Sequence, residues 1–129
     1  MCVYESLLVA AEKDGMEVVE KEFKSGAKGL CNGNKIGINK KLTLDEKSCV
    51  LAEELGHYYT TVGNILNTNN LNNSRQEKRA RKWAVNQLIT IDDLILAYKE
   101  NCTNIETTAE CLGITTDFLI EAIDVFKAV

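Results

Sequence analysis

The chain has 129 residues, of which 45% are hydrophobic and 26% charged, and its formal net charge is -4. This length suffices for one ordinary core, so the sequence predicts a single domain over residues 1–129. No run approaches the roughly 20 apolar residues that cross a bilayer, and the N-terminal segment lacks the basic flank of a signal peptide. We therefore expect a cytoplasmic protein that contacts no membrane. The net charge gives it no general attraction to nucleic acid.

The cysteines are odd in number and contain no CxxC pair. This pattern argues against a disulfide framework and against a thiolate zinc site, and it favours buried free thiols. The five are Cys2, Cys31, Cys49, Cys102 and Cys111.

The first forty residues predict one helix followed by strands. Apolar residues recur at helical spacing over 2–13, and Asp14-Gly15 then breaks the pattern. The segment 16–23 is rich in β-branched residues, as strands are. Asn32-Gly33 lies between two short apolar runs in 29–39, which is a strong local signal for a hairpin. We expect a small three-stranded sheet.

Two capping boxes introduce the next helices. Thr43 with Glu46 precedes an apolar run and predicts a buried helix over 44–60. The Asn-rich segment that follows has no periodicity and is predicted to be a loop. Ser74 with Glu77 then predicts the start of a second helix, which runs to about Leu88.

Residues 89–129 are predicted to form a helical C-terminal subregion. Thr90 caps a helix over 91–101, a short helix over 105–112 ends at Gly113, and Thr115 or Thr116 caps a last helix to Lys127. The expected fold is therefore α+β, with a small sheet packed against a helical majority.

A polar stripe interrupts the buried helix 44–60. Between Ser48 and Tyr59 only Glu53, Glu54 and His57 ionise at ordinary pH, and they fall within a sector of about 100°. Burying two carboxylates without partners costs several kcal/mol, so the fold must supply a cation, a set of donors or an open cleft there.

The following helix offers one more acidic side chain to the same region. Glu77 is in line with Ala84 and Leu88, so we expect it to point toward the apolar layer. The alternative is that Glu77 merely closes its own capping box with Ser74. The basic residues nearby are interpreted as a solvated helix face, with a contact for an acidic partner as the alternative. They are Arg75, Lys78, Arg79, Arg81 and Lys82.

These two helices resemble those of a known family. The stretch CVLAEELGHYYT resembles the zincin-like active-site helix of the ImmA/IrrE metallopeptidases, and QEKRARKWAVNQLI resembles the helix that bears their third ligand. The family pattern is HExxH followed by Glu. The resemblance implies that Glu54 is the general base and that His57 and Glu77 bind the metal. Glu53 stands where the family has its first histidine, so the motif here is EExxH.

The resemblance also implies a cofactor and a substrate. Zn²⁺ is the expected metal, and two carboxylate ligands also suit a harder ion such as Mn²⁺. His57 is the only histidine, so no second imidazole is available. The implied activity is that of a metal-dependent endopeptidase that cleaves a helix-turn-helix repressor of a prophage or mobile element. The strand 35–39 is expected to pair with the extended substrate.

Two other functions compete with this interpretation. A pseudo-peptidase would keep the fold as a repressor-binding module and lose catalysis through Glu53. A helix-turn-helix DNA-binding protein is suggested by the helix, glycine, helix outline of 106–126. Residues 90–129 contain eight acidic and two basic residues, and we expect Asp117, Glu121 and Asp124 to face solvent, where DNA phosphates would repel them. Direct contact with nucleic acid is therefore not expected.

Overall fold

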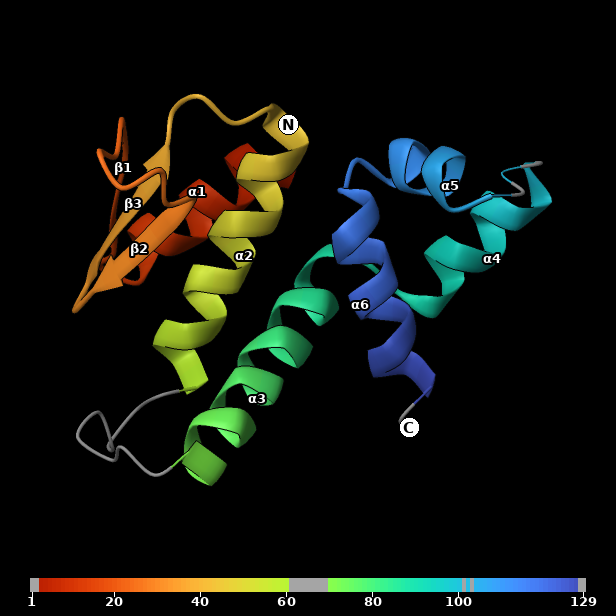
Figure 1. Ribbon diagram of the computed structural model, residues 1–129. Coiled ribbons are helices and arrows are strands. Elements are labelled where there is room, and N and C mark those ends of the chain that lie inside the picture. The colour runs from red at the N-terminus through yellow and green to blue at the C-terminus, as the bar shows by residue number, and fades with distance from the viewer. Residues whose placement is uncertain (1–2, 61–69, 101, 103, 128–129) are drawn as a thin grey trace.

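The fold is α+β, as predicted, with a helical majority beside one small sheet (Figure 1). The computed structural model describes residues 3–60, 70–100, 102 and 104–127, with the backbone alone over 70–74. In that part of the chain, no helix is both long and apolar enough to cross a membrane. The elements in chain order are α1 (Val3–Lys13), β1 (Glu17–Lys21), β2 (Gly29–Asn32), β3 (Lys35–Asn39), α2 (Leu44–Thr60), α3 (Asn70–Leu88), α4 (Ile91–Lys99), α5 (Ile105–Leu112) and α6 (Thr116–Lys127).

The sheet has the strand order β1-β3-β2, with β3 parallel to β1 and antiparallel to β2. The hairpin is confirmed, but its turn lies one residue later than predicted, because Asn32 pairs with Lys35 and the loop begins at Gly33. Gly33 has φ 59, a backbone conformation that favours glycine. The expectation that strand 35–39 is free to pair with a substrate is wrong, because β3 has a neighbour on each side. The outer strands are β1 and β2.

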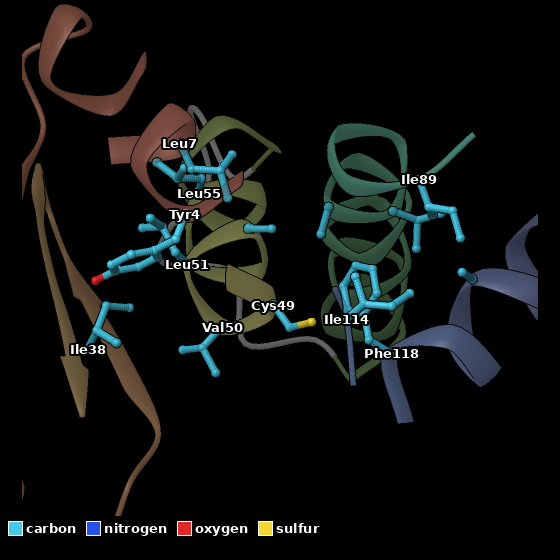
Figure 2. Packing of buried hydrophobic residues seen from close by; sticks show 14 of the residues in the cluster. Tyr4, Leu7, Ile38, Cys49, Val50, Leu51, Leu55, Ile89, Ile114 and Phe118 are labelled. Carbon is cyan, nitrogen blue, oxygen red and sulfur yellow. The ribbon is translucent and has the colours of Figure 1, made fainter. Parts of the chain in front are cut away.

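Helix α2 is buried on two sides, which explains its nearly continuous apolar run. Figure 2 shows Val50 and Leu51 on the side of the sheet, near Ile38 of β3. On the other side, Cys49 points toward Phe118 of α6 and Ile114 just before it. A helix between two layers can leave only a narrow polar stripe, and Glu53, Glu54 and His57 occupy it.

Local capping signals predicted most helix starts correctly. Thr43 and Glu46 form the predicted reciprocal box, with Glu46 N–H donating to Thr43 Oγ1 over 3.2 Å and Thr43 N–H donating to Glu46 Oε1 over 3.0 Å. Thr90 caps α4, and Thr115 accepts a hydrogen bond from Phe118 N–H at the start of α6. Helix α5 ends at Gly113, whose φ of 71 is left-handed.

The predicted start of α3 is wrong. The helix begins at Asn70, so Ser74 lies inside it and is not its N-cap. A capping box needs a non-helical backbone at its first residue, so the predicted box of Ser74 with Glu77 does not mark the start of α3.

The cysteines are only partly as expected. Cys31, Cys49, Cys102 and Cys111 are free thiols, and Cys49 and Cys102 are buried as predicted. The prediction of burial is wrong for Cys111, which is exposed, while Cys31 is half-buried. Cys2 lies outside the described residues.

Candidate metal and active site

The site lies where α2 and α3 cross. Gly56 faces the backbone of Ala80 so closely that a Cβ at residue 56 would overlap the Ala80 carbonyl oxygen. Only glycine permits this approach without moving one of the helices. The close approach sets the spacing between the residues that flank the crossing.

His57 and Glu77 face each other across this crossing. His57 Nε2 and Glu77 Oε2 are 3.7 Å apart, although the two residues are twenty positions apart in the sequence. The Glu77 side chain is 61% exposed and that of His57 34% exposed. The direction predicted for Glu77 is therefore right, but its burial is not: it lies at the mouth of the site.

Glu53 lines a pocket together with His57 and Glu77. A pocket of about 90 Å³ is lined by Glu53, His57 and Glu77, together with Ala80, Arg81 and Glu121. Burial, with a smaller contribution from the charge of Glu121, raises the pKa of Glu53 to about 7. A carboxyl group held in this way gains from a nearby cation.

Glu54 does not line that pocket, and its Cγ lies beside the edge strand β2. A Cβ at Gly29 would lie 3.4 Å from Cγ of Glu54 and 2.5 Å from Cγ1 of Val50, so β2 approaches α2 closely there. Burial raises the pKa of Glu54, His57 opposes that shift, and Glu77 adds to it. Glu54 therefore lies between the edge strand and the pair of His57 and Glu77.

Two charged residues of the pocket were not predicted as site residues. Arg81 was assigned to the solvated basic face, but it lines the pocket, and its Nε is 3.5 Å from Glu121 Oε2. Glu121 was expected to face solvent, but it is half-buried and lines the same pocket from α6. The i, i+4 spacing of Glu77 and Arg81 could have placed Arg81 on this face. No local sequence signal predicts that Glu121 of α6 lies at this pocket.

The donor chemistry fits a divalent ion. An imidazole nitrogen and a carboxylate oxygen that share one tetrahedral zinc stand roughly 3.4 Å apart, close to the 3.7 Å between His57 and Glu77. The carboxylate of Glu53 lines the same pocket. Within the described ranges, no three His, Cys, Asp or Glu side chains are gathered tightly enough to hold a metal ion. Two donors thus have nearly the required spacing, and the third stands across the pocket.

A comparison with known protein families gives one clear match. Residues 11–124 match the peptidase family described as the IrrE N-terminal-like domain, which covers most of the chain. The chain belongs to this family. The resemblance seen in the two helices is thereby confirmed over almost the whole sequence.

Membership in the peptidase family supports a metallopeptidase-type function. It implies, in general terms, a metal cofactor and a protein substrate. No curated protein and no solved structure matches the chain.

Proposed function

We propose that this chain is a metal-dependent endopeptidase whose metal is held by His57, Glu77 and Glu53. The observation that supports this most is the approach of His57 Nε2 to Glu77 Oε2, 3.7 Å across the crossing of α2 and α3. Gly56 maintains that approach.

The chemistry divides between the metal and Glu54. A divalent ion held here supplies Lewis acidity toward water and toward the carbonyl of the scissile peptide bond. Glu54 accepts the proton of the attacking water and later passes it to the leaving amine. Its position one residue from Glu53 and three from His57 keeps it on the polar stripe but turns it toward β2.

The substrate segment is proposed to lie along β2. This strand forms an outer edge of the sheet, and it is the strand that packs beside Glu54. An extended peptide that pairs with an edge strand is held by its backbone, so its scissile bond can be presented to the polar stripe of α2. We propose that this peptide comes from a transcriptional repressor.

A pseudo-peptidase is the second candidate, and one observation favours it. The charge of Glu121 raises the pKa of Glu53 and that of Arg81 lowers it, so Glu53 interacts with both residues. It stands apart from the close pair of His57 and Glu77. If Glu53 stays engaged with those residues, the metal has only two protein ligands. The chain would then bind a repressor without cutting it.

Cleavage assays separate these functions. The purified protein, loaded with Zn²⁺ or with Mn²⁺, is incubated with unfolded casein and with the repressor encoded nearest its gene, and fragments are identified by mass spectrometry. The proposal expects metal-dependent fragments with wild type and none with Glu54→Gln. Equal cleavage after removal of the metal with a chelator contradicts the metal mechanism. Binding of the repressor without any fragment identifies the pseudo-peptidase.

A further inference from the structure

Two cysteines outside the proposed site lie in direct contact. Sγ of Cys102, just beyond α4, is 2.7 Å from Sγ of Cys111 in α5. This separation exceeds the roughly 2.05 Å of a disulfide bond, yet it is far inside the contact distance of two non-bonded sulfurs. Both residues are free thiols in this structure.

The backbone around the pair brings the two sulfurs together. Cys102 N–H donates to the carbonyl of Ala97 over 3.0 Å, and Thr108 Oγ1 donates to the carbonyl of Cys102 over 3.2 Å. Thr108 and Cys111 are three residues apart on α5 and so share one face of that helix. The face that holds the Cys102 backbone therefore also presents Cys111 to its sulfur.

Helix α5 is fixed at both ends. The side chain of Asn104 accepts a hydrogen bond from Thr107 N–H at its start, over 2.7 Å. At its end, Gly113 is left-handed and its N–H donates to the carbonyl of Glu110. Forming a bond between the two sulfurs thus requires a side-chain adjustment and little backbone movement.

The two thiols differ in access. Cys111 is exposed, whereas Cys102 is buried. Contact with Cys111, followed by burial, raises the pKa of Cys102 to about 11. Cys111 is therefore the sulfur that an oxidant in solution reaches first, and Cys102 is the resolving thiol behind it.

We propose that Cys102 and Cys111 are a modification site that forms an intramolecular disulfide when the protein meets a small disulfide oxidant such as oxidised glutathione. The Cys111 thiolate attacks the oxidant, an S–S bond forms and one reduced glutathione leaves. The Cys102 thiolate then attacks the Cys111 sulfur and releases the second glutathione. The two cysteines lose two protons and two electrons, and the oxidant gains them.

Such a bond would tie the end of α4 to α5. Because α5 packs on α6 and α4 packs on α5, the crosslink would limit fraying of the C-terminal helices. It is expected to raise the midpoint of thermal unfolding by several degrees if these helices unfold with the rest of the domain.

Peptide mapping tests the pairing. Reduced protein is equilibrated in a buffer of oxidised and reduced glutathione, and free thiols are then blocked. Trypsin leaves both cysteines in one peptide, 100–127, while cleavage after Glu106 and Glu110 separates them. The proposal expects free thiols to fall from five to three, the tryptic peptide to lose two hydrogen atoms, and the second digest to yield the two cysteine peptides joined together.

Single serine variants serve as controls. Cys102→Ser and Cys111→Ser should each abolish the loss of two thiols, and Cys31→Ser should leave it intact. Three outcomes would overturn the proposal: five thiols that stay free, Cys111 that ends as a stable glutathione adduct, or covalent dimers through Cys111.

Discussion

Glu53 and Glu54 are neighbours in the sequence but face different parts of the molecule. Glu53 lines the pocket with His57 and Glu77, and Glu54 lies beside Gly29 of the edge strand. The divergence follows from the rotation of about 100° between successive helical residues. It suits a division of roles in which one carboxylate holds the metal and the other moves a proton.

Replacing Glu54 with glutamine separates these roles. Glu54→Gln keeps the size of the side chain but removes its ability to accept a proton, so peptide cleavage should fall by a factor of about 100 or more. Metal content should stay at the wild-type level, because Glu54 does not line the pocket that is proposed to hold the metal. Elemental analysis and cleavage rates check both statements. A variant that cuts at the original rate would show that another group activates the water.

Glu53→His tests the unusual first position of the motif. The change rebuilds HExxH on the same helix face and removes one negative charge from the proposed ligand set, so Zn²⁺ affinity should hold or rise while Mn²⁺ affinity falls. Glu53→Ala is the control and should bind both ions more weakly than wild type. Equal affinities in all three proteins, measured by calorimetric titration, would mean that Glu53 never touches the metal.

The sequence predicted four residues for the candidate site, of which Glu53, His57 and Glu77 line one pocket, but it did not predict the other charged residues there. Helical periodicity alone puts Glu53, Glu54 and His57 on one stripe, since they lie within one turn of each other. Arg81 was missed although its i, i+4 spacing from Glu77 is a local signal, and Glu121 was missed because its place depends on how α6 packs on α3, which no local pattern encodes. The exposure of Glu77 was missed for the same reason.

At the level of elements, Gly56 is the contact on which the site geometry depends. Gly56→Ala would normally stabilise a helix by about 1 kcal/mol. Here the added Cβ would meet the Ala80 carbonyl, so we expect a loss of about 1 to 3 kcal/mol in the free energy of unfolding. Urea denaturation measures the sign, and a stabilised variant would contradict the crossing described above.

A second substitution at the same crossing is the matched control. Because the overlap is with the backbone oxygen of Ala80 and not with its side chain, adding Ala80→Gly should not rescue Gly56→Ala. Recovery of stability in the double variant would show that side-chain crowding causes the loss. Metal affinity should fall with Gly56→Ala, since separating the helices separates His57 from Glu77.

A polar contact on the other side of α2 ties three elements together. Glu20 of β1 accepts hydrogen bonds from Tyr4 of α1 over 2.8 Å and from Lys47 of α2 over 2.7 Å. These partners, Lys47 first, hold the pKa of Glu20 below its ordinary value of 4.5. A lowered pKa in the folded state means that the contribution is present above pH 4.5 and is lost as pH falls through the lower folded value.

Glu20→Gln should therefore destabilise the protein more at pH 7 than at pH 3, because part of the contribution of the ionised Glu20 is lost below pH 4.5. The loss is expected to be about 0.2 to 1 kcal/mol, because the contact is partly exposed and screened by solvent. Urea midpoints at the two pH values measure it. Glu17→Gln, an exposed glutamate on the same strand, is the control. An equal loss for Glu20→Gln at both pH values would rule out the ionic contribution.

The elements were predictable where their signals are local, and their pairing was not. The box of Thr43 with Glu46 and the left-handed Gly113 each depend on residues within one turn. The strand order was missed because the central place of β3 depends on its pairing with β1, from which β2 separates it in the chain. The start of α3 was missed because its Asn-rich first turn is a poor helix former on its own.

At the scale of the whole molecule, α2 is the central helix, on which the sheet, α1 and α3 pack. The sheet and α1 pack on one side of it and α3 on another, and α6 packs on α3 (Figure 1). The polar stripe of α2 thus opens between an edge strand on one flank and two helices on the other. This arrangement provides a place for an extended peptide beside a pocket of charged side chains.

The pocket is proposed to hold one divalent ion at His57, Glu77 and Glu53. Calorimetric titration of Zn²⁺ and of Mn²⁺ into the wild-type chain and into the double variant His57→Ala, Glu77→Ala tests it most directly. We expect one ion per chain for wild type and loss of that binding in the double variant, with the helix content by circular dichroism unchanged. A double variant that still binds one ion with wild-type affinity would contradict it.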